Sequence, residues 1–355
     1  MGTLRLAPVT DASAWRGADL RDTDSWIYHL APEHITDVDA AIDGVVRRGL
    51  SLSEIERADF PLPTMQPLFA RALNDLARGR GFCLLRGLPV GRYSEQDASL
   101  IVWGIGTHFG MGVTQNAAEE LVGRVYDRGL RFGDPNVRAY QVRAELGLHC
   151  DPPDVVGLCC LRKAKSGGVS ILTSAMTVYN EILQTHSEYL GILFSGFVYG
   201  RKGEHAAGEP TVSPKIPVFS DLNGVLSCRY ARSYIEYARA NDGIELTPIE
   251  QEALDVFDAV ARREDVRLDM MLEPGDMQFA NNYVVLHART GYEDYAEPER
   301  KRHMLRLWLE APSLRDVADD IVRYGFIRFG KLGKTAKQLL AQRRAQTQMR
   351  GRART

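Results

Sequence analysis

The chain lacks long hydrophobic runs, secretion signals and cysteine motifs. Its longest apolar stretches, near residues 99–105 and 283–286, fall far short of the roughly 20 residues that a membrane span needs. No basic segment followed by an apolar stretch opens the sequence, so no secretory signal is expected. The five cysteines are an odd number without CxxC spacing, which argues against a disulfide framework and a structural zinc site. We therefore expect a cytoplasmic protein with reduced thiols and no membrane partner.

A strong charge of one sign is also lacking, because the net charge is −2. Residues 331–355 nevertheless carry eight of the 44 basic residues and no acid, which leaves 36 basic against 46 acidic residues in the rest. An acidic body with a short basic tail is not typical of a nucleic-acid-binding protein, so no nucleic-acid partner is expected. We interpret the tail as a solvated terminal segment, with docking on an acidic partner as the alternative.

The apolar periodicity predicts a few helices and many short strands. Helical spacing occurs at residues 42–48, 65–78, 94–109, 177–192 and 248–262, and Ser94 is a plausible helix cap three residues before Asp97. Strand-like runs occur at 82–85, 121–126, 139–142, 155–161, 169–173, 193–199, 218–220, 225–230, 266–271, 277–280, 283–288 and 303–310. This many short strands favours a mainly β sandwich or jelly roll with helical inserts over a parallel βαβ sheet.

No repeat or linker divides the chain, so we expect one domain. It would consist of an N-terminal extension (1–63), a β core (64–312) and a C-terminal helical segment with the basic tail (313–355). The sequence leaves the oligomeric state open.

Two tripeptides have the His-x-Asp/Glu pattern that supplies an imidazole and a carboxylate to a non-haem iron. About one such tripeptide is expected by chance from eight histidines and 46 acidic residues in 355. His186 and Glu188 fall in a predicted helix, where side chains at i and i+2 point apart, so we expect a surface pair. His149 and Asp151 end a β-rich stretch, where i and i+2 share a face and can reach one metal ion.

His287 is the candidate third ligand, at the end of the predicted strand 283–288. The preceding pair Asn281-Asn282 resembles a hairpin turn, which would place two adjacent strands side by side. Taken alone, a histidine that closes an apolar strand is more often a hydrogen-bonded core residue than a ligand.

Arg302 and Arg306 support a binding site, because strand alternation over residues 302–309 places both guanidinium groups on one face. Leu305, Leu307 and Leu309 take the opposite face. Two buried arginines require anionic partners, which a dicarboxylate would supply in a fork-like pairing. If the leucine face is the inner one, the arginines are simply solvated.

Taken together, these residues resemble the taurine dioxygenase/clavaminate synthase-like family of iron(II)- and 2-oxoglutarate-dependent oxygenases. The resemblance covers roughly residues 80–310 and adds the segments 166–170 (SGGVS) and 281–289 (NNYVVLHAR) to the pattern. It implies a double-stranded β-helix, a distorted jelly roll with the iron at its mouth.

The resemblance also implies roles for individual residues. It places His149, Asp151 and His287 as the ligands of Fe(II). Arg302 would clamp the distal carboxylate of 2-oxoglutarate and Ser170 would support that cosubstrate. Arg306 would act on the cosubstrate or on an anionic substrate, and the long spacing from His287 leaves open whether the two arginines exchange roles. With O2, such an enzyme would oxidise an unactivated C–H bond, most often by hydroxylation, and release succinate and CO2.

The substrate is less sharply indicated. Gln115 and Asn116 lie roughly where amino-acid hydroxylases of this family place a polar substrate contact, and Gln141 and Glu145 precede the first ligand. With Arg306, these groups would suit a small polar substrate such as an amino acid or a related metabolite. For each of them a surface or supporting role is an equal alternative.

Other functions remain open from the residues alone. A redox-inactive, cupin-like metalloenzyme would use the same three ligands, but its activity would need neither the two arginines nor oxygen. A non-catalytic binding protein is disfavoured by the complete ligand set. Within the oxygenase interpretation, desaturation and ring closure use the same cofactors.

Overall fold

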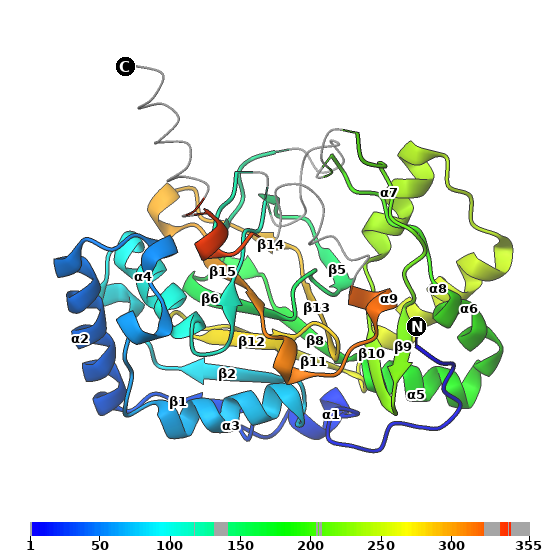
Figure 1. Cartoon of the computed structure of the whole chain (residues 1–355), viewed down its shortest axis with the longest axis horizontal. Coiled ribbons are helices and arrows are strands. Elements are labelled where there is room, and N and C mark those ends of the chain that lie inside the picture. Colours follow the sequence, from blue (N-terminus) through cyan, green and yellow to red (C-terminus); the bar gives the residue numbers. More distant parts are fainter. Residues whose placement is uncertain are drawn as a thin grey trace.

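The structure is a computed structural model that describes residues 2–116, 118–130, 141–203, 205, 208–322, 334–339 and 341 (Figure 1). Strands occupy the middle of the molecule, and helices flank them on both sides. Within the described residues, no helix combines the length and the apolar character that a membrane crossing requires. Most of the basic tail lies outside the described residues.

A large, mostly antiparallel sheet has the order β1-β2-β12-β6-β15-β3, and β4 also pairs with β15. Its strands are β1 (Ile27–His29), β2 (Phe82–Arg86), β3 (Met111–Gly112), β4 (Val122–Val125), β6 (Val155–Arg162), β12 (Met277–Asn281) and β15 (His303–Glu310). The smaller sheet has the order β11-β8-β13-β5 and consists of β5 (Leu146–His149), β8 (Ser170–Ser174), β11 (Arg267–Met270) and β13 (Val285–Arg289). Two further strand pairs are β9 (Phe219–Leu222) with β10 (Val225–Cys228) and β7 (Ser166–Gly167) with β14 (Tyr292–Glu293).

The α-helices are α1 (Gly17–Leu20), α2 (Pro32–Arg48), α3 (Gln66–Ala77), α4 (Glu95–Gly106), α5 (Ala175–Thr185), α6 (Leu190–Ser195), α7 (Arg232–Asp242), α8 (Pro248–Ala261) and α9 (Asp319–Val322). Local sequence signals set several of their ends. Ser94 Oγ accepts a hydrogen bond from Asp97 N at the start of α4, as expected. Thr247 and Glu250 form a capping box at the start of α8.

Both faces of the large sheet are buried, and alternate residues of each strand serve different cores. Leu305, Leu307 and Leu309 of β15 belong to a cluster that includes buried side chains of α2, α3 and α4. Met304 and Trp308 belong to the other cluster, which also contains the apolar side chains of the small sheet. Arg302 and Arg306 lie on the Met304/Trp308 side, so the interpretation of the arginines as solvated is wrong.

Two sheets that face each other across one core agree with the expected jelly-roll architecture. The cluster that contains Met304 and Trp308 joins the two sheets and continues to α5, α6 and α8 behind the small sheet.

The division of the chain into segments 1–63, 64–312 and 313–355 stays a prediction. Segment 139–142 was expected as a strand; residues 139 and 140 lie outside the described residues, and 141–142 are not in a strand.

The Asn281-Asn282 pair does not form the expected hairpin. β12 lies in the large sheet and β13 in the small one, so the chain crosses between sheets at this point. Asn281 Oδ1 accepts a hydrogen bond from Tyr283 N, and Asn281 Nδ2 donates to the carbonyl of Leu76. These hydrogen bonds fix the segment where the chain passes from the large sheet to the small one. A two-residue hairpin turn would not require them.

The expected strand 193–199 is also wrong. Leu190 and Leu193 are buried at helical spacing in α6, and Gly196 ends the helix with a left-handed φ of 82°. Only a single bridge from Phe197 to Ile216 remains of the strand pattern.

The helix predicted at 42–48 is longer than expected. Pro32 opens α2 at its first turn, and Val38, Ala41, Ile42 and Val45 give the helix a buried face.

Candidate metal centre

His149 and His287 face each other directly across two antiparallel strands. His149 ends β5 and is the register partner of His287 in β13. Their ring centroids are 4.3 Å apart. His149 Nδ1 lies 2.9 Å from the carbonyl oxygen of Gly147, which can only accept, so Nδ1 carries the proton and Nε2 holds the lone pair in the neutral ring. The strand pairing thus brings together two histidines that are 138 positions apart in the sequence.

Asp151 completes the cluster two residues after His149. Its Oδ1 lies 3.7 Å from His149 Nε2, and its Oδ2 lies 3.8 Å from His287 Nε2. The three potential ligand atoms all lie within 4.8 Å of one another, and the site lies between the sheets with Asp151 and His287 buried. The structure therefore brings together the three residues that the sequence analysis selected.

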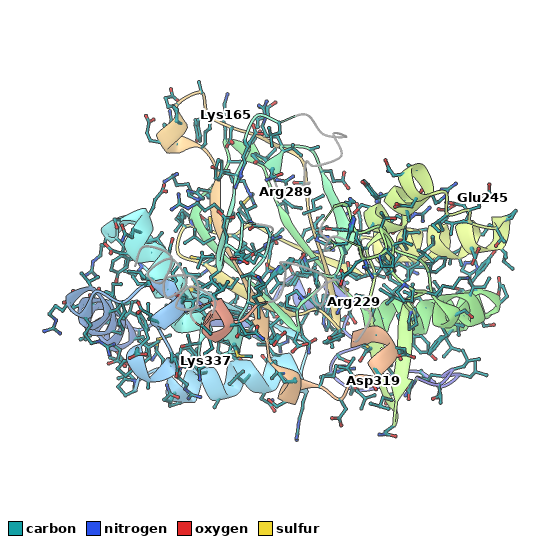
Figure 2. All side chains as sticks on the ribbon, turned by 45° about the horizontal axis from the view of Figure 1, so that its top comes forward. Lys165, Arg229, Glu245, Arg289, Asp319 and Lys337 are labelled. Atoms are coloured by element: carbon teal, nitrogen blue, oxygen red, sulfur yellow. The ribbon has the colours of Figure 1, made fainter. Side chains whose placement is uncertain are left out.

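Three other segments of the chain hold Asp151 in place. Its backbone N donates to Asn282 Oδ1 at 3.0 Å, and its carbonyl accepts from Arg229 Nη1 at 2.8 Å. Its Oδ2 accepts a hydrogen bond of 2.9 Å from the indole Nε1 of Trp308. Figure 2 shows Arg229 in the central part of the molecule, away from the peripheral Lys165 and Glu245.

Two of the three groups, His287 and Asp151, favour the protonation state that binds a cation. Burial lowers the pKa of His287 to about 3, and the adjacent His149 acts in the same direction. Burial alone would raise the pKa of Asp151, but the charge of Arg306 and the two imidazoles outweigh it and hold that pKa well below its usual range. Burial lowers the pKa of His149, yet its interactions with Asp151 and the Gly147 carbonyl outweigh burial and leave it raised. A neutral imidazole and an ionised carboxylate are the forms that bind metals.

Arg302, directly before the strand that carries Arg306, is buried with much of its hydrogen-bonding capacity unused. Its exposed fraction is 5%, and its Nε and Nη1 have no hydrogen-bond partner among the described residues. The guanidinium lies 5.1 Å from the ring centroid of Tyr292. A Cβ at Gly168 would come within 3.3 Å of Arg302 Nε, so the glycine keeps the approach to the guanidinium open. Burial lowers the pKa of Arg302, which reflects the cost of a desolvated charge.

Ser170 and Arg306 approach the same inner space from opposite sheets. Ser170 Oγ donates to Gln278 Oε1 of β12 at 3.1 Å, across the gap between the sheets. Arg306 Nη1 lies 3.7 Å from Asp151 Oδ2. Arg306 Nε donates to Gln115 Oε1 at 2.8 Å, and Gln115 Nε2 donates back to the Arg306 carbonyl at 2.7 Å.

The predicted substrate residues lie in different settings. Gln115 is buried and is committed to Arg306 and to the Leu121 carbonyl. Asn116 bonds within its own turn, to Glu120 and to the backbone of residue 118. Gln141 is half-buried and its carbonyl accepts a hydrogen bond from Arg128 N, whereas Glu145 is exposed. Substrate contact by these four residues stays a prediction.

The second tripeptide lies on the surface, as expected. α5 ends at Thr185, Glu188 lies in the short 3-10 helix Ser187–Tyr189 that follows, and His186 Nδ1 and Glu188 Oε1 are 3.7 Å apart. Both side chains are exposed, at 44% and 61%. Within the described residues, no further group of three potential ligands gathers around this pair.

Comparison with known proteins identifies the family. Residues 47–308, well over half of the chain, match the model of the taurine catabolism dioxygenase TauD/TfdA family. The chain belongs to this family. It is therefore an oxygenase, and the resemblance inferred from the sequence is confirmed; the redox-inactive alternative is not supported.

Two curated relatives cover most of the chain. The FR-33289 synthase of Streptomyces rubellomurinus is 34% identical over 312 residues, which are 87% of this chain and 92% of that protein. The taurine hydroxylase-like protein SAT17 of Stachybotrys chartarum is 25% identical over 84% of this chain and 79% of its own length.

Solved structures confirm the double-stranded β-helix fold. An asparagine oxygenase in complex with Fe(II), 3-hydroxyasparagine and succinate superimposes with a TM-score of 0.62 and 15% identity, over 80% of this chain and 93% of that one. The non-haem iron oxygenase OrfP, in complex with iron and α-ketoglutaric acid, gives a TM-score of 0.60 and 14% identity, over 80% and 94% of the two chains.

Several residues of this TauD/TfdA family site were not found from the sequence. Trp308 could have been found, because it shares the strand face of Arg302 and Arg306. Asn282 and Arg229 act through long-range contacts with the Asp151 backbone, for which the sequence carries no local signal. Arg289, labelled in Figure 2, donates to the backbone carbonyls of Val142 and Ala144.

Proposed function

We propose that the protein is an Fe(II)- and 2-oxoglutarate-dependent dioxygenase that hydroxylates an unactivated C–H bond of a small polar substrate, best an amino acid or an amino-acid-derived metabolite. The observation that carries the proposal is the buried His149/Asp151/His287 cluster with the guanidinium of Arg302 on the same inner face. Desaturation or ring closure with the same cofactors is the alternative outcome.

The three side chains fit a metal ion. The separations of 3.7 and 3.8 Å between the imidazole nitrogens and the carboxylate are too long for hydrogen bonds. They are shorter than the span of about 4.2 Å that two bonds of about 2.1 Å to a common ion can reach. Two imidazoles and one carboxylate are the donor set of non-haem Fe(II) oxygenases, and they leave coordination positions open.

The neighbouring residues fit a dicarboxylate. Two buried nitrogens of Arg302 find no partner in the described part of the chain, and a carboxylate would satisfy them with charge-assisted hydrogen bonds. Pairing would also offset the cost of burying the guanidinium. The Ser170 hydroxyl, oriented by Gln278, supplies a further polar contact on the opposite sheet.

Bound iron and 2-oxoglutarate would supply the oxidation, in which O2 is consumed, 2-oxoglutarate yields succinate and CO2, and one oxygen atom reaches the substrate. The chain's own work is to bind and orient. His149, Asp151 and His287 would hold the metal, and Arg302 and Ser170 would hold the cosubstrate. We assign Arg306 to an anionic group of the substrate, with Gln115 fixing its direction. The apolar residues of the two sheets exclude water from the surroundings of the site.

The substrate class rests on charge and on the solved neighbours. Arg306 offers a cation for a carboxylate, while the exposed Glu145 offers an anion near the strand that carries His149. Two of the structurally similar proteins hold 3-hydroxyasparagine or 3-hydroxyarginine. We therefore propose an amino acid or a close derivative as the first compounds to test.

The test is anaerobic loading of the protein with Fe(II) and 2-oxoglutarate, followed by O2 and measurement of succinate over a panel of amino acids and small acids. We expect a visible charge-transfer absorption in the anaerobic complex and succinate formation that one compound class stimulates. Absence of the absorption would refute the cosubstrate site. Cosubstrate binding without any stimulation by amino acids would refute the substrate class.

A further inference from the structure

Trp308 lies on the inner face of β15, directly beside the metal cluster. Its exposed fraction is 5%, and the guanidinium of Arg306 lies 4.9 Å from its ring centroid. The neighbouring leucines of β15 face the opposite core. The tryptophan therefore shares the space between the sheets with Asp151.

The indole N–H of Trp308 is used differently from those of the other three tryptophans. Trp15, Trp26 and Trp103 donate to the backbone carbonyls of Arg80, Leu20 and Ile55. Trp308 donates to a carboxylate oxygen, Asp151 Oδ2, at 2.9 Å. A hydrogen bond to an ionised acceptor is stronger than one to a neutral carbonyl, particularly where both groups are buried.

This hydrogen bond fixes the orientation of the Asp151 carboxylate. Asn282 and Arg229 already hold its backbone N and carbonyl. The indole then sets the rotation of the carboxylate, since it engages Oδ2 while Oδ1 lies 3.7 Å from His149 Nε2 and Oδ2 lies 3.8 Å from His287 Nε2. Arg306 Nη1 is 3.7 Å from Oδ2, which is beyond hydrogen-bond length, so its contribution is one of charge.

We propose that Trp308 is a positioning residue for the metal site: its indole N–H engages Oδ2 of Asp151 and fixes the orientation in which the carboxylate is presented to the ion. The inference rests on the metal site proposed above. A carboxylate bound through one oxygen leaves three of six positions open, whereas binding through both oxygens would take one of the positions that cosubstrate and O2 need. Hydrogen bonds to ligating carboxylates tune metal affinity in this way.

The experiment is an equilibrium titration of the metal-free protein with Co²⁺, without cosubstrate, followed by the visible absorption of the bound ion. Trp308→Phe keeps an aromatic ring and removes the N–H. A second variant carries 3-benzothienylalanine at position 308, which keeps the bicyclic shape and replaces the N–H by sulfur. Trp103→Phe is the matched control, because it removes a buried indole donor that serves the Ile55 carbonyl.

We expect both variants at position 308 to raise the Kd for Co²⁺ by about 10- to 100-fold, while Trp103→Phe leaves it unchanged. Thermal unfolding of the metal-free proteins separates this effect from loss of packing, since a purely structural tryptophan would lower the Tm without changing the Kd. A Kd within threefold of the wild-type value in the benzothienyl variant would overturn the inference. Absence of Co²⁺ binding by the wild-type protein would instead refute the metal site on which it rests.

Discussion

Replacement of Arg302 by methionine should separate cosubstrate binding from stability. Methionine fills a similar volume but cannot donate hydrogen bonds, and Arg302 has two buried nitrogens without a partner among the described residues. Hydrogen bonds to charged groups contribute about 1.5–3 kcal/mol each, so two of them amount to about 3–6 kcal/mol. At about 1.4 kcal/mol per factor of ten, Arg302→Met should weaken 2-oxoglutarate binding by about 10²- to 10⁴-fold.

The thermal stability of Arg302→Met should not fall, in contrast to its affinity for 2-oxoglutarate. In the protein without cosubstrate, the buried guanidinium is desolvated and its pKa is lowered by burial, so its charge costs free energy. The cation–π contact of the guanidinium with Tyr292 stabilises the folded state by only about 0.5–1 kcal/mol. We therefore expect the Tm of metal-free Arg302→Met to equal or exceed that of the wild type.

The assay is anaerobic titration of the Fe(II)-loaded proteins with 2-oxoglutarate, followed by the charge-transfer absorption and paired with thermal unfolding. Arg300→Met is the matched control, because Arg300 is two residues away and 54% exposed. Arg302→Met with a 2-oxoglutarate Kd within threefold of the wild type would refute the clamp. A strongly lowered Tm in the same variant would show that the guanidinium is paired in the free protein, which contradicts the reasoning.

Three further predictions address other parts of the site and the fold. Asp151→Ala should reduce succinate formation by more than about 100-fold, whereas His186→Ala, on the exposed second tripeptide, should leave it unchanged; equal activity of both variants would contradict the ligand assignment. Gln115→Leu should raise the KM for the substrate by about tenfold or more while the Kd for 2-oxoglutarate is unchanged, because it removes the hydrogen bonds of Gln115 to Arg306 and to the Leu121 carbonyl and leaves Arg302 and Ser170 in place; an effect on 2-oxoglutarate alone would assign Arg306 to the cosubstrate. Burial lowers the pKa of His303, so the unfolded chain takes up this proton first as the pH falls below about 6.5, and stability is lost. His303→Asn should therefore lessen the fall in the free energy of unfolding between about pH 7 and pH 5, measured with urea; an unchanged fall would exclude this histidine as its source.

The alternation along β15 was readable from the sequence, but the direction of its two faces was not. Arg302 and Arg306 were placed correctly on one face, opposite Leu305 and Leu307. Because α2, α3 and α4 cover the leucine side, both faces of the strand are buried. Alternation shows which residues share a face, and only the positions of distant helices show which face is the inner one.

The failures concern features that depend on contacts far along the chain. The Asn281-Asn282 pair has the composition of a tight turn, yet its amides bind the carbonyls of Leu76 and Pro153 and the backbone N of residue 151. Segment 193–199 has β-forming residues, but packing of Leu190 and Leu193 against the core selects a helix at its start. In both places tertiary contacts overrode local preference.

The cluster of His149, Asp151 and His287 shows why the convergence of side chains is easier to predict than the groups that hold them in place. His149 and Asp151 are two residues apart on an extended chain, so their convergence follows from local geometry. The rigidity of Asp151 follows from residues 78, 131 and 157 positions away, which bind its carbonyl, its backbone N and its carboxylate. None of these contacts changes which residue can bind a metal, but together they decide how the carboxylate is presented to it. A substitution at Asn282, Arg229 or Trp308 should therefore change metal affinity or ligand geometry while the three ligand side chains remain in the sequence.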